Sequence, residues 1–280
     1  MTIVPAWADA FLPGRLREAS PLPGRQRITR EDAYGDGRGT GVKVAIVDSG
    51  IDAEHPDVRG VAGGAVPEAD RDAPDGVRIV EGPHDDVFGH GTACAGIVRE
   101  LAPGVELYSV RVLGRRLTGR AYVFARGLEW CLEHGIQVVN LSLSTSNESW
   151  YAGFHEICDD AAHAGVVLVS ALNNQRGASY PSEFSSVLSV AATIGEDREV
   201  FSRNPDPPAE WGAPGIDVVV AQPGGRHMRT TGNSFAAPVI AGHCARILGA
   251  NPGLAPFQVK AVLAELADNA ASSAPPAPPA

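Results

Sequence analysis

The chain has 280 residues, of which 44% are hydrophobic, and it carries a formal net charge of −10. This length suits one large α/β domain or two small ones. The acidic balance and the lack of a Lys/Arg-rich run argue against a nucleic-acid partner, and the longest apolar stretches are too short to span a membrane. No feature of the sequence indicates an oligomeric state.

The first 40 residues are rich in Pro, Gly and Arg and show little hydrophobic periodicity. We interpret 1–40 as an N-terminal arm that wraps the following domain and holds one short helix. Its opening lacks the basic start and the apolar stretch of a secretory signal. Four widely spaced cysteines show no CxxC pattern, which predicts free thiols and a cytoplasmic location. These are Cys94, Cys131, Cys158 and Cys244.

From residue 41 the pattern alternates between strands and helices. Continuous apolar, β-branched runs predict buried strands over 42–50, 106–114, 136–144, 166–172 and 186–193. Helical periodicity and terminal glycines predict helices over 90–101, 120–135, 150–165, 234–250 and 255–267, with Pro238 placed in the first turn of its helix. The alternation predicts an α/β fold of three layers, a mainly parallel sheet with helices on both faces.

The globular domain is expected to span 41–268. The tail 269–280 consists mostly of Ala, Pro and Ser. Such a composition buries too little apolar area to offset the entropy of ordering, so the tail is predicted to be disordered.

Three polar residues lie at ends of predicted elements, where the functional sites of parallel sheets gather. Asp48 ends the first strand in IVDSGID, His90 opens a helix in GHGTACAG, and Ser234 opens another in GNSFAAPVIAG. A serine hydroxyl is a poor nucleophile until a base within hydrogen-bond reach takes its proton, and an acid must orient that base. The three residues can supply nucleophile, base and orienting acid.

Acyl transfer also needs donors for the oxyanion of the tetrahedral intermediate. Asn174, which follows the strand 166–172, can supply a side-chain amide, and the Ser234 N–H can supply a second donor at a helix N-terminus. Asn173 is a rival for the first of these positions.

Each of these residues also has an ordinary structural interpretation. Alone, Ser234 is a helix N-cap, His90 a helix-start histidine and Asp48 a turn aspartate with Asp52 as a rival. Three further histidines are interpreted as solvated loop residues: His55, His84 and His227.

The order of these motifs resembles that of the subtilisin-like serine proteases, the subtilases. VAIVDSGID with HPDV after it, GHGTACAGI and GNSFAAPVIAG resemble the aspartate, histidine and serine motifs of the family. VVNLSLS resembles the strand that walls the specificity pocket, and GVVLVSALNNQ the segment that carries the oxyanion asparagine, with Asn174 at the matching place. The resemblance runs from about Lys43 to about Leu266. It implies a subtilisin-like fold and a serine endopeptidase that forms an acyl-enzyme on Ser234.

The resemblance also implies a peptide or protein substrate, bound as an extended strand between two enzyme strands. The residues expected to bind it are Leu117, Thr118, Gly119, Ser142, Leu143, Ser144 and Asn173. Ser144 and Asn173 replace usual glycines, which predicts a narrow pocket and a dedicated processing protease, for example one that trims a precursor peptide. Three arginines nearby either select acidic substrate side chains or form a solvated cluster: Arg115, Arg116 and Arg120.

Several residues depart from the family pattern. Asn233 and Phe235 flank Ser234 where Thr and Met are usual, and Asn233 is expected to keep a polar side chain beside the oxyanion hole. Cys94 resembles the cysteine of the proteinase K branch; it is either a target for mercurials or a small buried thiol. The family calcium loop after the histidine helix is missing from IVRELAPGVELYSV, which leaves Asp57 without it. No metal and no other cofactor are therefore expected.

Two alternatives to hydrolysis stay open at this point. One is transpeptidation or macrocyclisation, in which an amine intercepts the acyl-enzyme, although the sequence has no capping insert over the site. The other is an inactive pseudoprotease that binds peptides by strand addition.

Overall fold

The computed structural model describes residues 5–16, 28–73, 76–82 and 84–270. Its centre is a nine-stranded sheet with the order β3-β2-β4-β1-β5-β6-β7-β9-β8. All neighbours from β2 to β9 are parallel, and the outermost β3 and β8 are antiparallel to their partners. The strands are β1 Lys43–Asp48, β2 Gly63–Ala69, β3 Val77–Glu81, β4 Glu106–Arg111, β5 Val138–Leu141, β6 Val167–Ala171, β7 Leu188–Ile194, β8 Ser202–Arg203 and β9 Trp211–Ile216.

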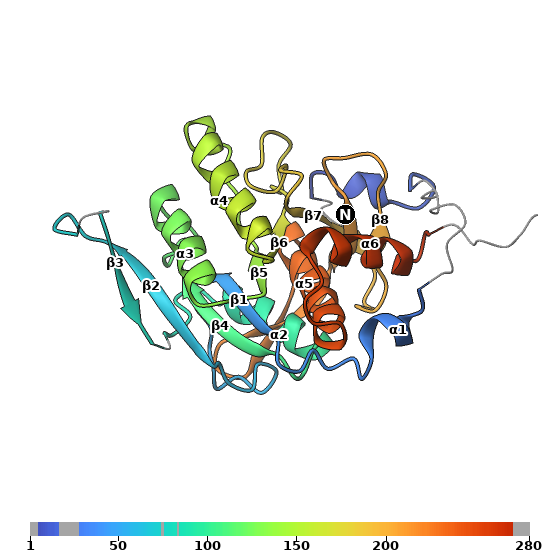
Figure 1. Cartoon of the computed structure of the whole chain (residues 1–280), viewed down its shortest axis with the longest axis horizontal. Helices are drawn as coiled ribbons and strands as arrows, with labels where there is room; N and C mark the ends of the chain where they lie inside the picture. The colour runs from blue at the N-terminus through green and yellow to red at the C-terminus, as the bar shows by residue number, and fades with distance from the viewer. Residues whose placement is uncertain (1–4, 17–27, 74–75, 83, 271–280) are drawn as a thin grey trace, which may run out of the picture.

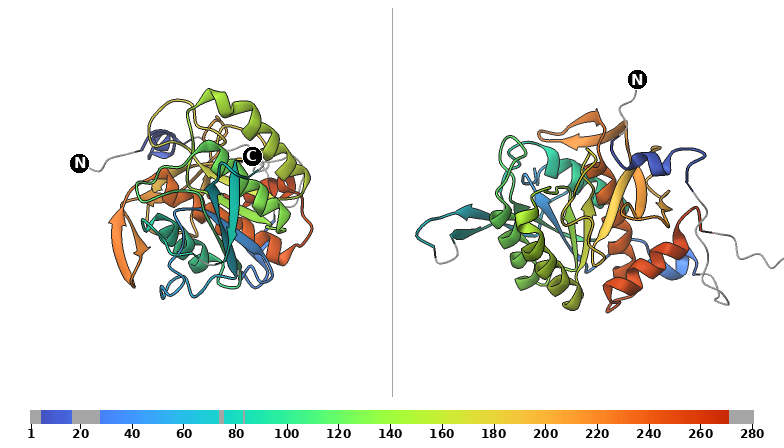
Figure 2. Two further views of the ribbon diagram at one scale, coloured as in Figure 1. Left: turned by 90° about the vertical axis from the view of Figure 1, so that its left-hand side faces the viewer. Right: turned by 90° about the horizontal axis from the view of Figure 1, so that it is seen from above.

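Helices cover both faces of this sheet (Figures 1 and 2). α3 (Ala121–Glu133) and α4 (Tyr151–His163) pack on one face. α2 (His90–Leu101), α5 (Asn233–Ala250) and the C-terminal α6 (Pro256–Leu266) belong to the other. The predicted three-layer α/β arrangement is therefore confirmed.

The two-residue period of a strand explains the two cores. In β1, Val44 and Ile46 point into the core with α2 and α5, whereas Ala45 and Val47 point into the core with α3 and α4. All four side chains are fully buried. A strand that is apolar on both faces must lie inside the sheet, which places the end of β1 at the centre of the molecule.

The ten predicted elements are present with ends shifted by a few residues, but several strands were not predicted. β2, β3, β8 and β9 are absent from the predictions, as is a separate ribbon of β10 (Val218–Gln222) and β11 (Arg226–Thr230). β2 reads GGAVPEA and β9 reads WGAPGI, so their glycines and prolines hide the apolar pattern. The placement of Pro238 was wrong, because α5 begins at Asn233 and the proline lies beyond its first turn.

Short elements join the predicted arm to the domain. The 3₁₀ helix η1 (Ala8–Phe11) lies beside β7 and β9, and α1 (Arg30–Tyr34) packs against α5. A further 3₁₀ turn, η2 (Glu148–Trp150), precedes α4. Residues 1–4 and 17–27 of the predicted arm, and 271–280 of the predicted tail, lie outside the described residues. Asn269 exchanges two hydrogen bonds with the main chain of Arg203 in β8.

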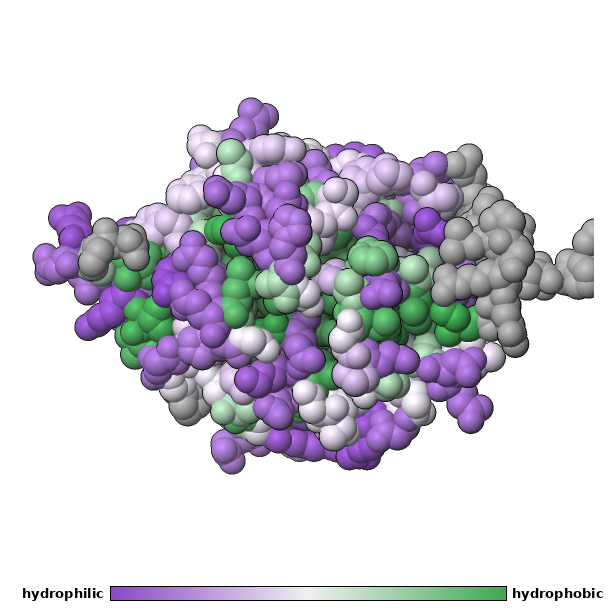
Figure 3. All heavy atoms as spheres, viewed as in Figure 1, coloured by the Kyte–Doolittle hydropathy of each residue, from purple (hydrophilic) through white to green (hydrophobic). Residues whose placement is uncertain are grey.

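On the face shown in Figure 3, hydrophilic side chains are spread over the surface with smaller hydrophobic areas between them. Among the described residues, no helix combines the length and the apolar character that crossing a bilayer requires.

Candidate active site

Asp48, His90 and Ser234 form one hydrogen-bonded row. The Nδ1 of His90 lies 2.8 Å from Oδ2 and 3.0 Å from Oδ1 of Asp48, and its Nε2 lies 2.9 Å from the Ser234 Oγ. Asp48 is fully buried, while the other two side chains are partly exposed. The rival Asp52 instead accepts hydrogen bonds from the Glu54 and Gly224 main chain.

The local sequence brings these groups together from three elements. Asp48 is the last residue of β1, His90 the first of α2 and Ser234 the second of α5. Gly91 permits the close approach of α2 to β1, because a Cβ at this position would lie 2.0 Å from the Gly50 carbonyl oxygen. Any side chain there would push His90 away from Asp48.

Asp86 holds the start of α2 and was not singled out from the sequence. Its Oδ2 accepts hydrogen bonds from the Thr92 N–H and hydroxyl at 2.8 and 2.6 Å, and its Oδ1 accepts from Gly89 N–H at 2.7 Å and the Ser49 hydroxyl at 2.8 Å. A carboxylate at this place satisfies first-turn amides and suits the positive end of the helix. An acid four residues before the helix-start histidine was the available sequence signal.

The charge of Asp48 sets the protonation of His90. Burial is the largest single influence and disfavours the imidazolium, but the Asp48 carboxylate with its hydrogen bond and the adjacent Cys94 together outweigh burial and hold the His90 pKa well above its usual 6.5. In the neutral imidazole the same contact fixes the tautomer: Nδ1–H donates to Asp48, and Nε2 accepts from the Ser234 hydroxyl. The imidazole is thereby oriented to take a proton from Ser234.

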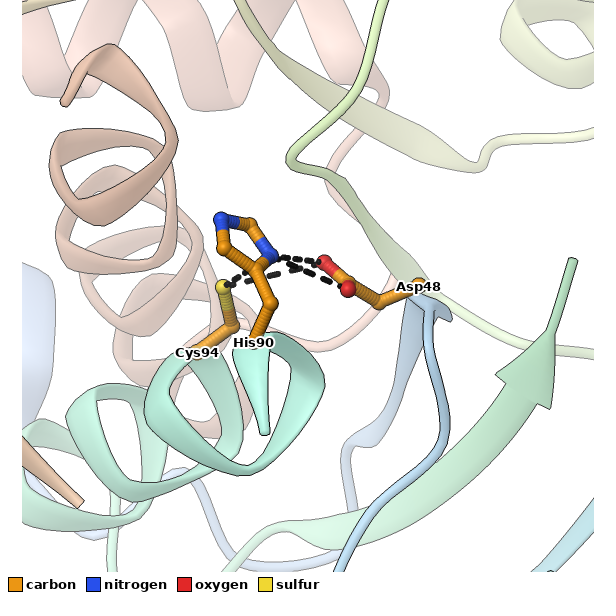
Figure 4. Close-up of side chains that lie close together, drawn as sticks. All are labelled: Asp48, His90 and Cys94. Carbon is orange, nitrogen blue, oxygen red and sulfur yellow. Dashed lines mark hydrogen bonds and ion pairs between the residues drawn. The ribbon is translucent and has the colours of Figure 1, made fainter. Parts of the chain in front are cut away.

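Cys94 lies one turn after His90 and beneath it (Figure 4). Its Sγ is 3.9 Å from Asp48 Oδ2, 4.0 Å from His90 Nδ1 and 3.3 Å from the Ser142 Oγ. The side chain is fully buried, and burial raises the pKa of its thiol. The thiol is therefore neutral at physiological pH and packs as a small apolar group.

A second set of contacts holds the main chain of Ser234. Pro238 has no N–H, so the Ser234 carbonyl lacks its partner four residues along the helix. The Ser142 hydroxyl donates to that carbonyl at 2.8 Å and accepts from the Asn140 amide at 2.8 Å. Ser142 thus lines the cleft while its hydroxyl is occupied by Ser234.

Asn174 lies beside Ser234 on the loop after β6. Its Oδ1 accepts from the Asn233 N–H at 2.9 Å, which leaves the NH₂ of the same amide for another acceptor. The rival Asn173 uses its Oδ1 to accept from the Gln175 N–H. As expected, Asn233 keeps its polar side chain beside the segment that carries Asn174: the side chain is fully buried, accepts from the Ala192 N–H, and donates to the main-chain carbonyls of Ala6, Leu172 and Asn173.

A cleft of about 420 Å³ opens at His90 and Ser234. All seven residues expected to bind substrate line it: Leu117, Thr118, Gly119, Ser142, Leu143, Ser144 and Asn173. Arg120 also lines the cleft, whereas Arg115 and Arg116 do not. Its apolar wall includes Ala121, Phe124 and Phe154 from α3 and α4, which sequence reasoning missed because helical periodicity assigned them to the core.

Around Asp57, the residue that matches a ligand of the family calcium site, the oxygens have partners within the protein. The Asp57 carboxylate pairs with His227 Nε2 at 2.7 Å. The Arg99 guanidinium donates to four main-chain carbonyls, those of Val58, Gly60, Pro103 and Val105. Calcium takes six to eight oxygen ligands; the Asp57 carboxylate is paired with His227 and these four carbonyls accept from Arg99, so these groups do not fit that ion as they stand.

His55, predicted to be solvated, is 1% exposed. Its Nε2 lies 2.9 Å from the Arg226 carbonyl oxygen, and its Nδ1 accepts from the Asp57 N–H. His55, Asp57 and His227 have ligand atoms within 4.8 Å of one another. The two ring nitrogens of His55 are both engaged by the main chain, so this cluster lacks a free third ligand.

Comparison with known proteins finds relatives that resemble this chain in sequence and in fold. The profile of the subtilase family matches residues 39–277. The chain is 31% identical over 240 residues to a thermostable alkaline protease of Halalkalibacterium halodurans, which covers 82% of this chain and 63% of that protein. It is also 31% identical to subtilisin DY of Bacillus licheniformis, over 83% of this chain and 85% of the relative, and to subtilisin Savinase of Lederbergia lenta, over 87% and 90%.

Among solved structures, a cold adapted subtilisin-like serine proteinase matches with a TM-score of 0.62 and 23% identity. The match covers 80% of this chain and 81% of that structure. It confirms the predicted subtilisin-like fold. Because the family profile covers most of the chain, this protein belongs to the subtilase family.

Proposed function

We propose that this protein is a serine endopeptidase in which Ser234 is the nucleophile, His90 the base and Asp48 the acid that orients it. The observation that carries the proposal is the continuous row from carboxylate to imidazole to hydroxyl, with both links at 2.8–2.9 Å. The row opens into a cleft of about 420 Å³, and subtilase family membership supports the same chemistry.

In the acylation step, the Ser234 Oγ attacks the peptide carbonyl carbon while its proton moves to His90 Nε2. The C=O electron pair moves onto oxygen, which in this proposal accepts hydrogen bonds from the Asn174 NH₂ and the Ser234 N–H. Collapse of this intermediate breaks the C–N bond, and the leaving amine takes the proton from His90. The Asp48 carboxylate stabilises the imidazolium between these transfers.

In the deacylation step, water replaces the amine. His90 Nε2 takes a proton from water, the hydroxide oxygen bonds to the acyl carbon, and the Ser234 Oγ leaves with the proton from His90. The products are a free carboxylate and the regenerated hydroxyl. An amine in place of water would give transpeptidation instead.

We further propose restricted specificity and a processing role in the cytoplasm. Ser144 and Asn173 both line the cleft, and each carries side-chain atoms that the glycines usual in the family lack. The four cysteines are all buried and unpaired, which suits a reducing compartment. Arg120 extends the cleft wall with a positive charge and favours acidic upstream side chains.

Two measurements test this function. A fluorophosphonate probe is expected to label wild type on Ser234 and to leave Ser234→Ala unlabelled; an unlabelled wild type indicates a pseudoprotease. A proteome-derived peptide library, read by mass spectrometry, is expected to yield few cleavage motifs, with acidic upstream residues that disappear in Arg120→Ala. Rapid cleavage of casein at many unrelated sites contradicts restricted specificity, and ligated peptides indicate transpeptidation.

A further inference from the structure

The N-terminal arm contacts the loop that carries Asn174. The Ala6 N–H donates to the Asn174 carbonyl at 2.8 Å, and the Ala6 carbonyl accepts from the Asn233 Nδ2 at 3.0 Å. The neighbouring Asn233 N–H binds the Asn174 side chain. Ala6 of the arm therefore contacts both Asn174 and Asn233, although these residues lie about 170 and 230 positions further along the chain.

Asn233 joins the two sides of this contact. Its Nδ2 also lies 3.0 Å from the Leu172 carbonyl and 3.3 Å from the Asn173 carbonyl, while its Oδ1 accepts from the Ala192 N–H at 2.9 Å. The side chain has no exposed surface. A buried carboxamide with all its groups satisfied has one low-energy orientation, so it fixes the arm against the loop.

Packing holds the arm in this register. Phe11 of η1 is 8% exposed and lies over Gly212 of β9, where a Cβ would come within 2.2 Å of the ring. Its other apolar neighbours include Leu172, the residue that leads into the loop. The surface of β9 at position 212 accommodates the Phe11 ring only because a glycine stands there.

An ion pair closes the outer end of the same contact. One Arg176 Nη lies 2.8 Å from both carboxylate oxygens of Asp9, and the guanidinium stacks 5.1 Å from the centre of the Trp7 ring. Arg176 belongs to the Asn174 loop. Partly exposed pairs of this kind contribute little stability alone, but this one adds a second attachment two residues beyond Asn174.

We propose that the arm segment 5–11 is a positioning element for the oxyanion site. It holds the main chain of Asn174 through Ala6, and Asn233 aligns the Asn174 amide with the same framework. The inference rests on the proposed function, in which Asn174 stabilises the transition state. Because a donor displaced by a fraction of an ångström loses most of its effect on the transition state, loosening the arm lowers kcat more than it raises KM.

Phe11→Ala tests the proposal in the full chain, with Phe257→Ala as the matched control, since Phe257 is 73% exposed on α6. Phe11→Ala is expected to lower kcat on a peptide substrate by about tenfold or more and to change KM by less than about twofold. Added to Asn174→Ala, it is expected to produce little further loss, because the arm acts through that side chain. An unchanged kcat, or an equal loss in both backgrounds, overturns the proposal.

Hydrogen exchange provides a readout that does not depend on turnover. In Ser234→Ala protein, Phe11→Ala is expected to speed exchange of the Ala6 amide and of the amides at 173–177, while Phe257→Ala leaves them unchanged. Unchanged exchange in the Phe11 variant overturns the proposal whatever the activity. An inactive wild type counts against the proposed function, and the exchange result still decides the role of the arm.

Discussion

We expect the buried His243 to make the stability of this protein dependent on pH. It lies in α5 without exposed surface, with Nε2–H donated to the Arg198 carbonyl at 2.9 Å and Nδ1 accepting from the Tyr34 hydroxyl at 2.8 Å. Burial lowers the His243 pKa from 6.5 to about 4. Arg246 and Arg30 disfavour the charged ring as well, and the Arg198 carbonyl opposes this only in part.

The sign follows from the direction of the shift. The folded-state pKa is depressed, so the unfolded chain binds a proton below pH 6.5 that the folded chain refuses until about pH 4. The contribution of His243 to the free energy of unfolding is therefore fully present above about pH 6.5 and is lost as the pH falls toward 4. The loss from His243 amounts to about 2 kcal/mol at pH 5 and about 3 kcal/mol at pH 4.

Urea unfolding between pH 7.5 and 4 measures this effect. The full chain carries Ser234→Ala to prevent self-digestion and is compared with the same chain carrying His243→Gln, whose amide still donates toward Arg198. All other titrating groups are common to both, so the difference in unfolding free energy isolates His243. The wild-type advantage is expected to shrink by about 3 kcal/mol from pH 7.5 to pH 4. Parallel pH profiles would refute the reasoning.

Further predictions concern the site and its surroundings. Asp86→Ala is expected to lower unfolding free energy by about 2 kcal/mol or more and to reduce kcat, as urea unfolding and peptide hydrolysis report, whereas equal stability contradicts its role at α2. A chelator is expected to leave Tm unchanged, while Arg99→Met is expected to lower it. A sharp drop in Tm with chelator would show that the protein binds calcium. The raised His90 pKa places the acid limb of kcat/KM above pH 6.5, and Asp48→Asn moves it down; a limb below pH 6 argues against the ion pair. Iodoacetamide is expected to alkylate Cys94 only after unfolding, by mass spectrometry, and reaction in the native state contradicts burial.

The sequence predicted the site better than its surroundings. Asp48, His90 and Ser234 lie in short motifs whose glycines and small residues reflect local geometry, so each could be located before its neighbours were known. β9 could not be located, because WGAPGI has the composition of a turn and becomes a strand only by pairing with β7. Its pattern is decided by tertiary contacts.

The sequence also did not reveal side chains whose hydrogen-bond partners lie far away in the chain. His55 reads as a loop histidine, and only the return of β11 past it supplies the Arg226 carbonyl that buries it. The side-chain NH₂ of Asn233 donates a hydrogen bond to the carbonyl of Ala6 in the arm, more than 220 positions away. Local sequence carries no signal for such contacts, since each partner is defined by the folded chain.

Pro238 has a mechanical consequence. By withholding an N–H, it releases the Ser234 carbonyl from α5 and makes it available to Ser142 at the end of β5. Ser234, the proposed nucleophile, is thus held both by its helix and by Ser142, and residues 142–144 line the cleft. We therefore expect a peptide that displaces residues 142–144 to act through the Ser142 hydroxyl on the main chain of Ser234, which would link occupancy of the cleft to the placement of the Ser234 Oγ.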